Sequence, residues 1–223
     1  MEEKIYFNND RGDRLSGILS KPDVDTIVPI VILCHGLNSE KNSRTHMALE
    51  KVFLENNIAT FRFDFFAHGE SEGKIDDRSL EEFVENIQKA VEYVKSRGYK
   101  DIGLCGTSFG GVASVMVASR NHDIKVMALK AAGMGQTSRK MPNYMKHFET
   151  KSWIEAGKKV KIPALIIHGT QDKDVEIDLA EQLHKAIRTS KMIILDGADH
   201  RFSRTEDFDR SIKEISEFII KNI

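Results

Sequence analysis

The sequence contains few cysteines and no long apolar run. Its two cysteines, Cys34 and Cys105, lie within apolar segments, where we expect small buried thiols, with a disulfide as the alternative. Two cysteines exclude a disulfide scaffold, so the reducing cytoplasm is the expected compartment. No apolar run approaches the roughly 20 residues needed to cross a bilayer. Residues 1–7 also lack the apolar segment of a secretory signal. We therefore expect a cytoplasmic protein without a membrane span.

The chain also lacks an excess of charge of either sign. It carries 33 basic and 34 acidic residues, for a formal net charge of −1. No overall field attracts nucleic acid or an anionic membrane, so we expect a small-molecule partner and no nucleic acid. A length of 223 residues fits one α/β domain over 1–223. The sequence does not fix the oligomeric state, and a homodimer is one assembly that it allows.

Apolar segments of strand length alternate with segments of helical period along most of the chain. This alternation is typical of a mostly parallel sheet with helices on both faces. The strands are expected at 28–34, 58–63, 101–105, 124–131, 163–167 and 191–195, and the helices at 44–56, 80–94, 109–120, 176–188 and 206–222. Before them, residues 4–7 and 13–20 flank a turn-rich segment, which predicts an antiparallel hairpin at one edge. The predicted fold class is therefore α/β.

Residues 132–161 interrupt this alternation, because they are too long and irregular for a simple connection between strands. The segment has seven basic residues (Arg139, Lys140, Lys146, Lys151, Lys158, Lys159, Lys161) against two acidic ones (Glu149, Glu155). We interpret it as a short lid insertion that contacts the substrate. The candidate contact residues are its large apolar side chains, namely Met134, Met141, Tyr144, Met145, Phe148 and Trp153.

Gly106-Thr107-Ser108-Phe109-Gly110 matches the pattern Gly-x-Ser-x-Gly. Because the pentapeptide follows a predicted strand and precedes a predicted helix, Ser108 is expected on the sharp turn called a nucleophile elbow. Small residues there let strand and helix approach, while the serine is held in strained backbone geometry. A glycine-rich turn for phosphate is the alternative.

A serine hydroxyl needs a general base, and the base needs an acid that fixes its tautomer. Asp172 follows the strand predicted at 163–167, and His200 follows the strand predicted at 191–195. Ser, Asp and His therefore occur in the chain order of this kind of hydrolase, at strand ends that open on one edge of the sheet. Asp174 is an alternative acid. His168 is an alternative base, although it precedes the acid.

The oxyanion of a tetrahedral intermediate needs hydrogen-bond donors. The backbone N–H of Phe109 is one candidate, and the N–H of Leu37, which follows His35-Gly36 after the first parallel strand, is the other. The remaining histidines lack metal-ligand spacing and are expected at the surface; they include His46, His122, His147 and His184. This chemistry requires no metal and no cofactor.

Taken together, these motifs resemble the α/β-hydrolases, and within them the small-lidded serine esterases such as cinnamoyl and feruloyl esterases. Monoglyceride-lipase-like and serine-aminopeptidase-like members are also similar. The resemblance implies Ser108, Asp172 and His200 as a catalytic triad, with Leu37 and Phe109 as oxyanion donors. The family's segment corresponding to 64–73 usually reads Asp-x-x-Gly-x-Gly-x-Ser. Here Ala67 replaces the first glycine, and Asp199 stands where the family often has glycine.

The sequence thus predicts a serine hydrolase that cleaves carboxylic esters through an acyl-enzyme. Aryl or cinnamoyl-type esters and short-to-medium acyl esters are the candidate substrates. A thioesterase and a serine peptidase or acyl-peptide hydrolase use the same machinery and are the alternatives. A non-catalytic binding protein on this fold is a further alternative, which the complete triad disfavours.

Overall fold

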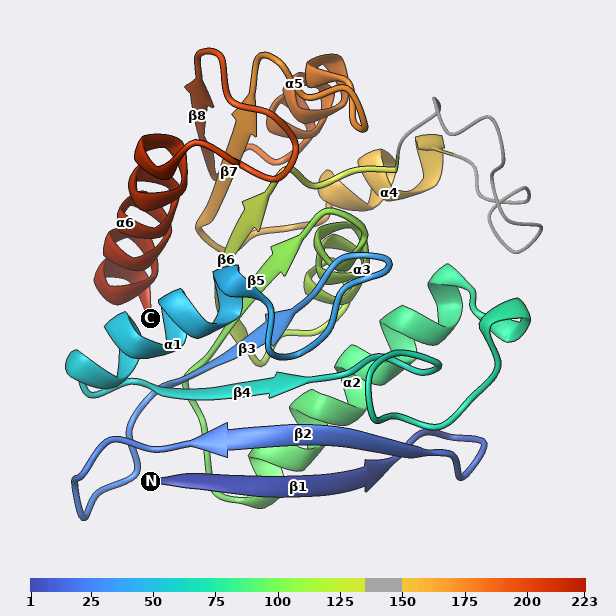
Figure 1. The fold of residues 1–223 in the computed structure, drawn as a ribbon, viewed down its shortest axis with the longest axis vertical. Helices are drawn as coiled ribbons and strands as arrows, with labels where there is room; N and C mark the ends of the chain where they lie inside the picture. The colour runs from blue at the N-terminus through green and yellow to red at the C-terminus, as the bar shows by residue number, and fades with distance from the viewer. Residues whose placement is uncertain (135–149) are drawn as a thin grey trace.

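A computed structural model describes residues 1–134 and 150–223 of the chain. Eight strands form one sheet in the order β1-β2-β4-β3-β5-β6-β7-β8 (Figure 1). The strands are β1 Glu2–Asn8, β2 Arg14–Ser20, β3 Ile30–Cys34, β4 Ala59–Phe63, β5 Ile102–Thr107, β6 Ile124–Lys130, β7 Ala164–Gly169 and β8 Ser190–Leu195. From β4 onward all neighbours in the sheet are parallel, whereas β1 pairs with β2 and β2 with β4 antiparallel. This confirms the predicted fold class.

The N-terminal hairpin forms because its turn satisfies its own backbone. The Asn9 side-chain oxygen accepts hydrogen bonds from the N–H groups of Arg11 and Asp13, at 3.1 and 2.7 Å. Gly12 between them has φ +87°, which a residue with a side chain rarely adopts. The hairpin occupies the edge of the sheet beside β4, as the sequence predicts (Figure 1).

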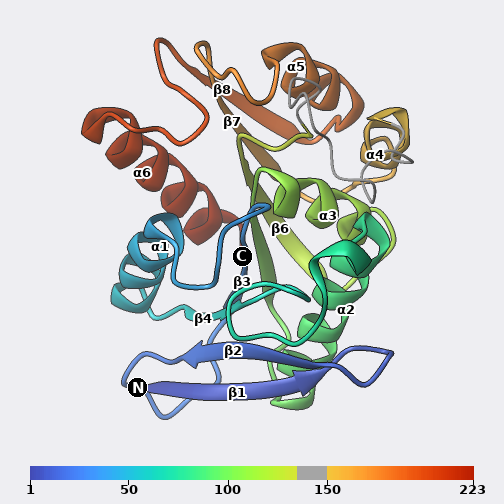
Figure 2. The same ribbon diagram turned by 45° about the vertical axis from the view of Figure 1, so that its right-hand side comes forward.

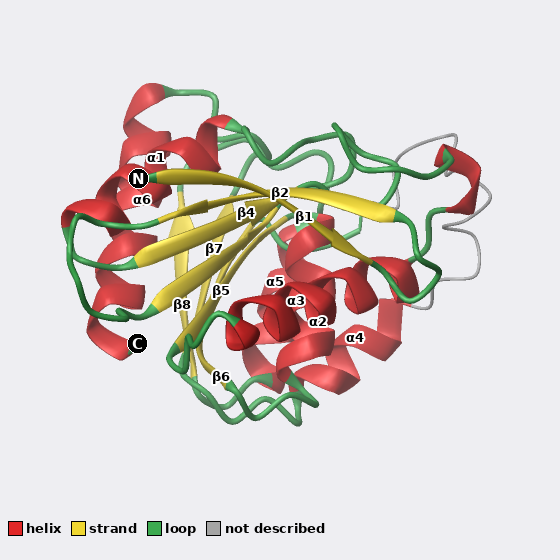
Figure 3. Cartoon of the chain, turned by 90° about the horizontal axis from the view of Figure 1, so that it is seen from below, coloured by secondary structure: helices red, strands yellow, loops and turns green. Residues whose placement is uncertain are grey.

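Helices cover both faces of the sheet. The helices are α1 Arg44–Glu55, α2 Leu80–Ser96, α3 Phe109–Ala118, α4 Thr150–Gly157, α5 Ile177–Ala186 and α6 Thr205–Asn222. Figures 2 and 3 show α1 and α6 together on one face and α2, α3, α4 and α5 on the other. Strand alternation divides the core accordingly: Ile30 and Ile32 pack toward the four-helix face, and Val31 and Leu33 toward α1 and α6. Strands buried on both faces explain the continuous apolar runs in the sequence.

Two elements were not predicted from the sequence. A short 3-10 helix, η1 at Ile75–Asp77, precedes α2, and α4 forms within the segment predicted as the lid insertion. Within the described part of the chain, no helix has the length and apolar character that crossing a membrane requires. The carboxyl ends of β3, β5, β6, β7 and β8 meet at one edge of the sheet. Their loops build the candidate site there.

Candidate active site

Ser108 lies on a strained turn between β5 and α3. Its backbone has φ 52° and ψ −121°, a conformation that residues with a side chain rarely adopt. The Ser108 N–H donates to the carbonyl oxygen of Lys130 on the neighbouring strand at 2.9 Å. A Cβ at Gly110 would lie 2.3 Å from the carbonyl oxygen of His35, so this position requires glycine. The turn therefore holds the half-buried serine at the end of the strand.

His200 and Asp172 approach Ser108 from the two later strand ends. His200 Nε2 lies 3.0 Å from Ser108 Oγ, and His200 Nδ1 lies 2.8 Å from Asp172 Oδ2. With the Nδ1 proton donated to the carboxylate, Nε2 is left as the acceptor of the serine proton. Three side chains from three loops thus form one continuous hydrogen-bonded chain.

The Asp172 carboxylate is fully buried and held in place by the backbone. Its Oδ1 accepts hydrogen bonds from the N–H groups of Asp174 and Val175, at 2.9 and 2.8 Å. Its Oδ2 also lies 3.2 Å from His168 Nε2. Burial raises the pKa of Asp172, but the contacts with His168, His200 and Val175 outweigh it and hold the pKa below its usual range. Asp172 is therefore ionised at neutral pH.

The two alternatives named above occupy other positions. The Asp174 residue is exposed on the same loop. His168 is buried, and its Nε2 donates to the carbonyl oxygen of Val175 at 3.0 Å. It contacts Oδ2 of Asp172, the same carboxylate oxygen that contacts His200. The structure thus brings Asp172, not Asp174, to His200, and His200, not His168, to Ser108.

The predicted oxyanion donors lie on the two loops beside the nucleophile. Phe109 is the first residue of α3, so its N–H has no acceptor within the helix. The backbone at Gly36 passes so close that a Cβ there would lie 3.1 Å from the Cβ of Ser108. Leu37 follows Gly36 and lines the same pocket as Ser108 and Phe109. Leu37 and Phe109 thus both border the pocket beside Ser108, as the predicted role of their N–H groups requires.

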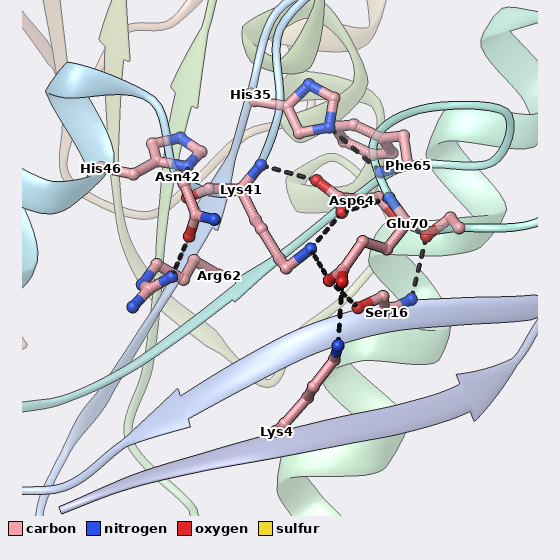
Figure 4. A network of polar contacts seen from close by, with 11 residues as sticks. Lys4, Ser16, His35, Lys41, Asn42, His46, Arg62, Asp64, Phe65 and Glu70 are labelled. Atoms are coloured by element: carbon pink, nitrogen blue, oxygen red, sulfur yellow. Dashed lines mark hydrogen bonds and ion pairs between the residues drawn. The ribbon is translucent and has the colours of Figure 1, made fainter.

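A buried ionic network anchors the loop that carries Leu37 (Figure 4). The Asp64 carboxylate accepts a hydrogen bond from the Lys41 N–H at 2.7 Å and pairs with the Lys41 ammonium. The ammonium also pairs with Glu70 at 2.7 Å, and the Glu70 N–H donates to Asp64 at 3.0 Å. Two loops are therefore joined by a buried lysine, which is 2% exposed. Breaking such a pair by removing one partner is strongly destabilising.

The buried side chain of His35 connects the same two loops by hydrogen bonds. Its Nε2 accepts a hydrogen bond from the Phe65 N–H at 3.1 Å, and its Nδ1 donates to the Gly36 carbonyl oxygen at 2.8 Å. Burial lowers the pKa of His35 well below its usual value, and the neighbouring His68 lowers it further. A neutral ring is needed for this arrangement, since Nε2 must accept. His35 therefore fixes the strand exit that positions Leu37.

Ala67 adopts a backbone conformation that favours glycine. Its φ is 57°, and its N–H donates to the Glu72 carbonyl oxygen at 2.8 Å. The turn at 64–73 thus forms although the usual glycine is replaced. The left-handed conformation costs a residue with a side chain about 1–2 kcal/mol.

We expect Ala67→Gly to raise the free energy of unfolding by about 0.5–1 kcal/mol, because relief of this strain exceeds the added chain entropy of glycine. Urea denaturation measures the change. Ala48→Gly, within α1, is the matched control and should lower stability by about 1 kcal/mol. A loss of stability in both variants would contradict the strain at Ala67.

Ser108 and His200 line a pocket of about 880 Å³, which suits a small organic ligand. Met134, among the predicted contact residues, also lines it. Trp153 does not, and here the prediction disagrees with the structure. The indole is fully buried, because the face of α4 that carries Trp153 and Gly157 packs toward Leu183 on α5. The other candidates, Met141, Tyr144, Met145 and Phe148, lie outside the described residues.

The prediction of a surface position for His46 is wrong. The side chain is 1% exposed, and burial lowers its pKa to about 4. It lies on the inward face of α1, near the carbonyl oxygen of Lys41. Among the residues that the structure describes, no cluster of His, Cys, Asp and Glu side chains could hold a metal ion.

Sequence reasoning overlooked Lys130, which also lines the pocket. It ends β6 and is 2% exposed. The signal was present in the sequence, because Val126, Ala128 and Lys130 alternate along one face of a buried strand. A charged residue at the end of such a series is unusual.

Comparison with known proteins supports the fold and gives a family. A protein-family model described as an alpha/beta hydrolase domain matches residues 28–223 of the chain. Among curated proteins, the alpha/beta hydrolase domain-containing protein aho-3 of Caenorhabditis elegans is 30% identical over 155 residues, which are 65% of this chain and 44% of that protein. The chain spans about half the length of the curated relatives that it matches first.

Two solved structures have a similar fold. Est1E from Butyrivibrio proteoclasticus, in a structure with bound ferulic acid, has a TM-score of 0.88 at 24% identity, covering 98% of each chain. The esterase Pf2001 of Pyrococcus furiosus has a TM-score of 0.83 at 18% identity, covering 100% of this chain and 93% of that one. At these identities the likeness concerns the fold alone.

Proposed function

The chain belongs to the alpha/beta hydrolase family, and from this premise we propose that it is a serine hydrolase that cleaves carboxylic esters. The observation that carries the proposal is the hydrogen-bonded series Ser108, His200 and Asp172, with distances of 3.0 and 2.8 Å, at the wall of a pocket. A buried, ionised acid hydrogen-bonded to a histidine is what activation of a serine hydroxyl requires.

In the proposed acylation step, Ser108 Oγ attacks the ester carbonyl carbon while His200 Nε2 takes the hydroxyl proton. The carbonyl oxygen becomes an oxyanion, which the N–H groups of Leu37 and Phe109 stabilise by hydrogen bonds. When the intermediate collapses, the bond to the alcohol oxygen breaks, and the leaving alcohol takes the proton from His200. An acyl group remains on Ser108.

Water completes the cycle. His200 removes a proton from water as the water oxygen attacks the acyl carbon, and the same oxyanion site is used again. Collapse releases the carboxylic acid and returns the proton to Ser108 Oγ. Throughout, the Asp172 carboxylate stabilises the imidazolium form of His200. The residues of this chain supply every proton transfer in the scheme.

We propose aryl or cinnamoyl-type esters and short-to-medium acyl esters as the first classes to examine. Ferulic acid bound to the similarly folded Est1E supports including the cinnamoyl class, and the pocket volume of about 880 Å³ accommodates such acyl groups.

A screen of matched esters, thioesters and aminoacyl amides tests the proposal. We expect p-nitrophenyl esters to be hydrolysed with a burst of p-nitrophenol when deacylation is slow, because an acyl-enzyme accumulates. Turnover of the amides alone, with the esters untouched, would contradict an esterase.

A further inference from the structure

A buried lysine, Lys130, lies beside the proposed nucleophile, and no carboxylate among the described residues forms an ion pair with it. Lys130 follows Val126 and Ala128 on the sheet face that packs against α1 and α6. Its side chain is 2% exposed, whereas Lys125 at the start of the same strand is exposed. Burying an ammonium group costs several kcal/mol unless it is compensated. The Lys130 ammonium therefore needs stabilising contacts within the protein or from a ligand.

Neutral groups provide the contacts that the structure records for this ammonium. Nζ donates to Thr45 Oγ1 at 3.2 Å and lies 4.4 and 5.4 Å from the ring centroids of Phe202 and Phe208. Cation–π contacts of this kind contribute, but they leave donor positions of the ammonium free. Within residues 1–134 and 150–223, no carboxylate forms an ion pair with Lys130.

A second cation shares the same aromatic ring. The guanidinium carbon of Arg44 lies 3.7 Å from the ring centroid of Phe208. We call Arg44, Thr45, Lys130 and Phe208 the cationic corner. All four line the pocket that contains Ser108. Two positive charges are thus gathered around one wall of the pocket.

The remaining charges around the pocket do not neutralise this corner. Arg201 adds a third cation to the described lining, and Asp174 is the acidic residue in it. Asp174 is exposed and belongs to the loop after β7. Asp199 attracts Lys130, but its carboxylate accepts a hydrogen bond from the Ser203 N–H at 2.8 Å. The described wall therefore favours an anion.

Thr107 adds a further polar group beside Lys130. The two residues are register partners on adjacent parallel strands and share the same face of the sheet. Within the described chain, Thr107 Oγ1 is buried and has no hydrogen-bond partner. A buried hydroxyl without a partner is uncommon, and this one is available to hydrogen-bond a ligand that reaches Lys130.

We propose that the cationic corner is a subsite for a carboxylate group of the substrate, so that the preferred esters carry an acid group in addition to the ester that is cleaved. This inference rests on the proposed function. Ser108 and Lys130 are linked by the backbone hydrogen bond of 2.9 Å between adjacent strands. Because Ser108 and the cationic corner line the same pocket, an ester held at Ser108 can extend its acyl chain toward the corner, and half-esters of dicarboxylic acids have the required shape.

The charge of Lys130 gives the subsite a pH dependence. Burial lowers its pKa to about 8, Arg44 lowers it further, and Cys105 and Asp199 oppose the change. Below pH 8 the group is mostly protonated and binds an anion; above pH 8 it loses its charge. The preference for an anionic ester should therefore fall as the pH rises through about 8. An arginine at this position stays charged and should keep the preference.

The test compares mono-p-nitrophenyl glutarate with p-nitrophenyl pentanoate, which has the same chain length but no acid group. At pH 7 we expect Lys130→Met to lower kcat/KM for the glutarate half-ester by at least about tenfold, from the loss of a charge-assisted contact, and to change the pentanoate value less than threefold. The matched control is Lys125→Met, which should alter neither. In wild type the ratio of the two values should fall above pH 8, and in Lys130→Arg it should not.

Equal loss on both esters in Lys130→Met, with Lys130→Arg no better, would overturn the subsite, since it would indicate a structural lysine. If Lys130→Met has the same ratio of glutarate to pentanoate kcat/KM as wild type, the subsite is overturned too. Labelling with a fluorophosphonate separates this failure from failure of the proposed function. If Ser108 is labelled in wild type and in Lys130→Met, the nucleophile stands regardless of the subsite. If wild type is not labelled, the proposed function itself fails.

Discussion

Ser108→Ala is expected to lower kcat for ester hydrolysis by at least about 10⁴-fold, the scale seen when the nucleophile of such a triad is removed. The reason is geometric, because Oγ is the atom 3.0 Å from His200 Nε2 at the end of the hydrogen-bonded series. KM is not expected to improve, since the pocket walls are unchanged. The rate is measured with a p-nitrophenyl ester under saturating conditions.

Folding of the Ser108→Ala variant should be almost unaffected, because alanine keeps the same backbone requirement at φ 52°. Its free energy of unfolding should change by less than about 0.5 kcal/mol. Ser119→Ala, at the opposite end of α3, is the matched control and should retain full activity. A Ser108→Ala protein with wild-type activity would eliminate the acyl-enzyme mechanism.

Asp172→Asn is expected to lower kcat by about 10⁴-fold while preserving the fold. The Oδ1 position already accepts hydrogen bonds from two backbone N–H groups, so the amide nitrogen of an asparagine would face His200. The amide would then donate to Nδ1, which moves the imidazole proton to Nε2. In that tautomer His200 cannot accept the serine proton.

The same substitution should also reduce stability at neutral pH. The folded-state pKa of Asp172 lies below its ordinary value of 3.8, so its ionised form stabilises the protein above that pH and loses this effect as the pH falls toward the folded-state pKa. Urea denaturation at pH 7 measures the loss.

Asp174→Asn is the matched control for the effect of Asp172→Asn on kcat, and we expect it to lower kcat by less than tenfold. The reverse order of effects would assign the acid to Asp174.

The sheet and the grouping of the site could be predicted because they depend on local patterns. Continuous apolar strands alternating with helical stripes predict a parallel sheet, and residues directly after such strands must meet at one edge. Ser108, Asp172 and His200 each follow a strand, so their proximity needs no knowledge of packing. The distances of 3.0 and 2.8 Å between them come from the structure.

Features that depend on packing between layers could not be predicted. Trp153 and His46 belong to helices whose buried faces are set by neighbouring helices, and a short helix such as α4 has too little sequence to fix its phase. The contact between His168 and Asp172 depends on how the loop after β7 turns back onto the end of that strand, which the apolar pattern does not give. For Lys130, the alternation of residues along the strand predicts which face of the sheet the side chain occupies, but it does not predict which residues cover that side chain. In the structure, aromatic rings from the segment after β8 cover it.

The most direct test of the account is to locate the covalent intermediate. Wild-type protein is treated with a fluorophosphonate or quenched during turnover of a slowly deacylating ester, and its peptides are analysed by mass spectrometry. We predict one adduct, on the peptide that contains Ser108, and slower labelling in Asp172→Asn. Ester turnover with the adduct on another residue, or without any adduct at Ser108 under either treatment, would contradict the proposed mechanism.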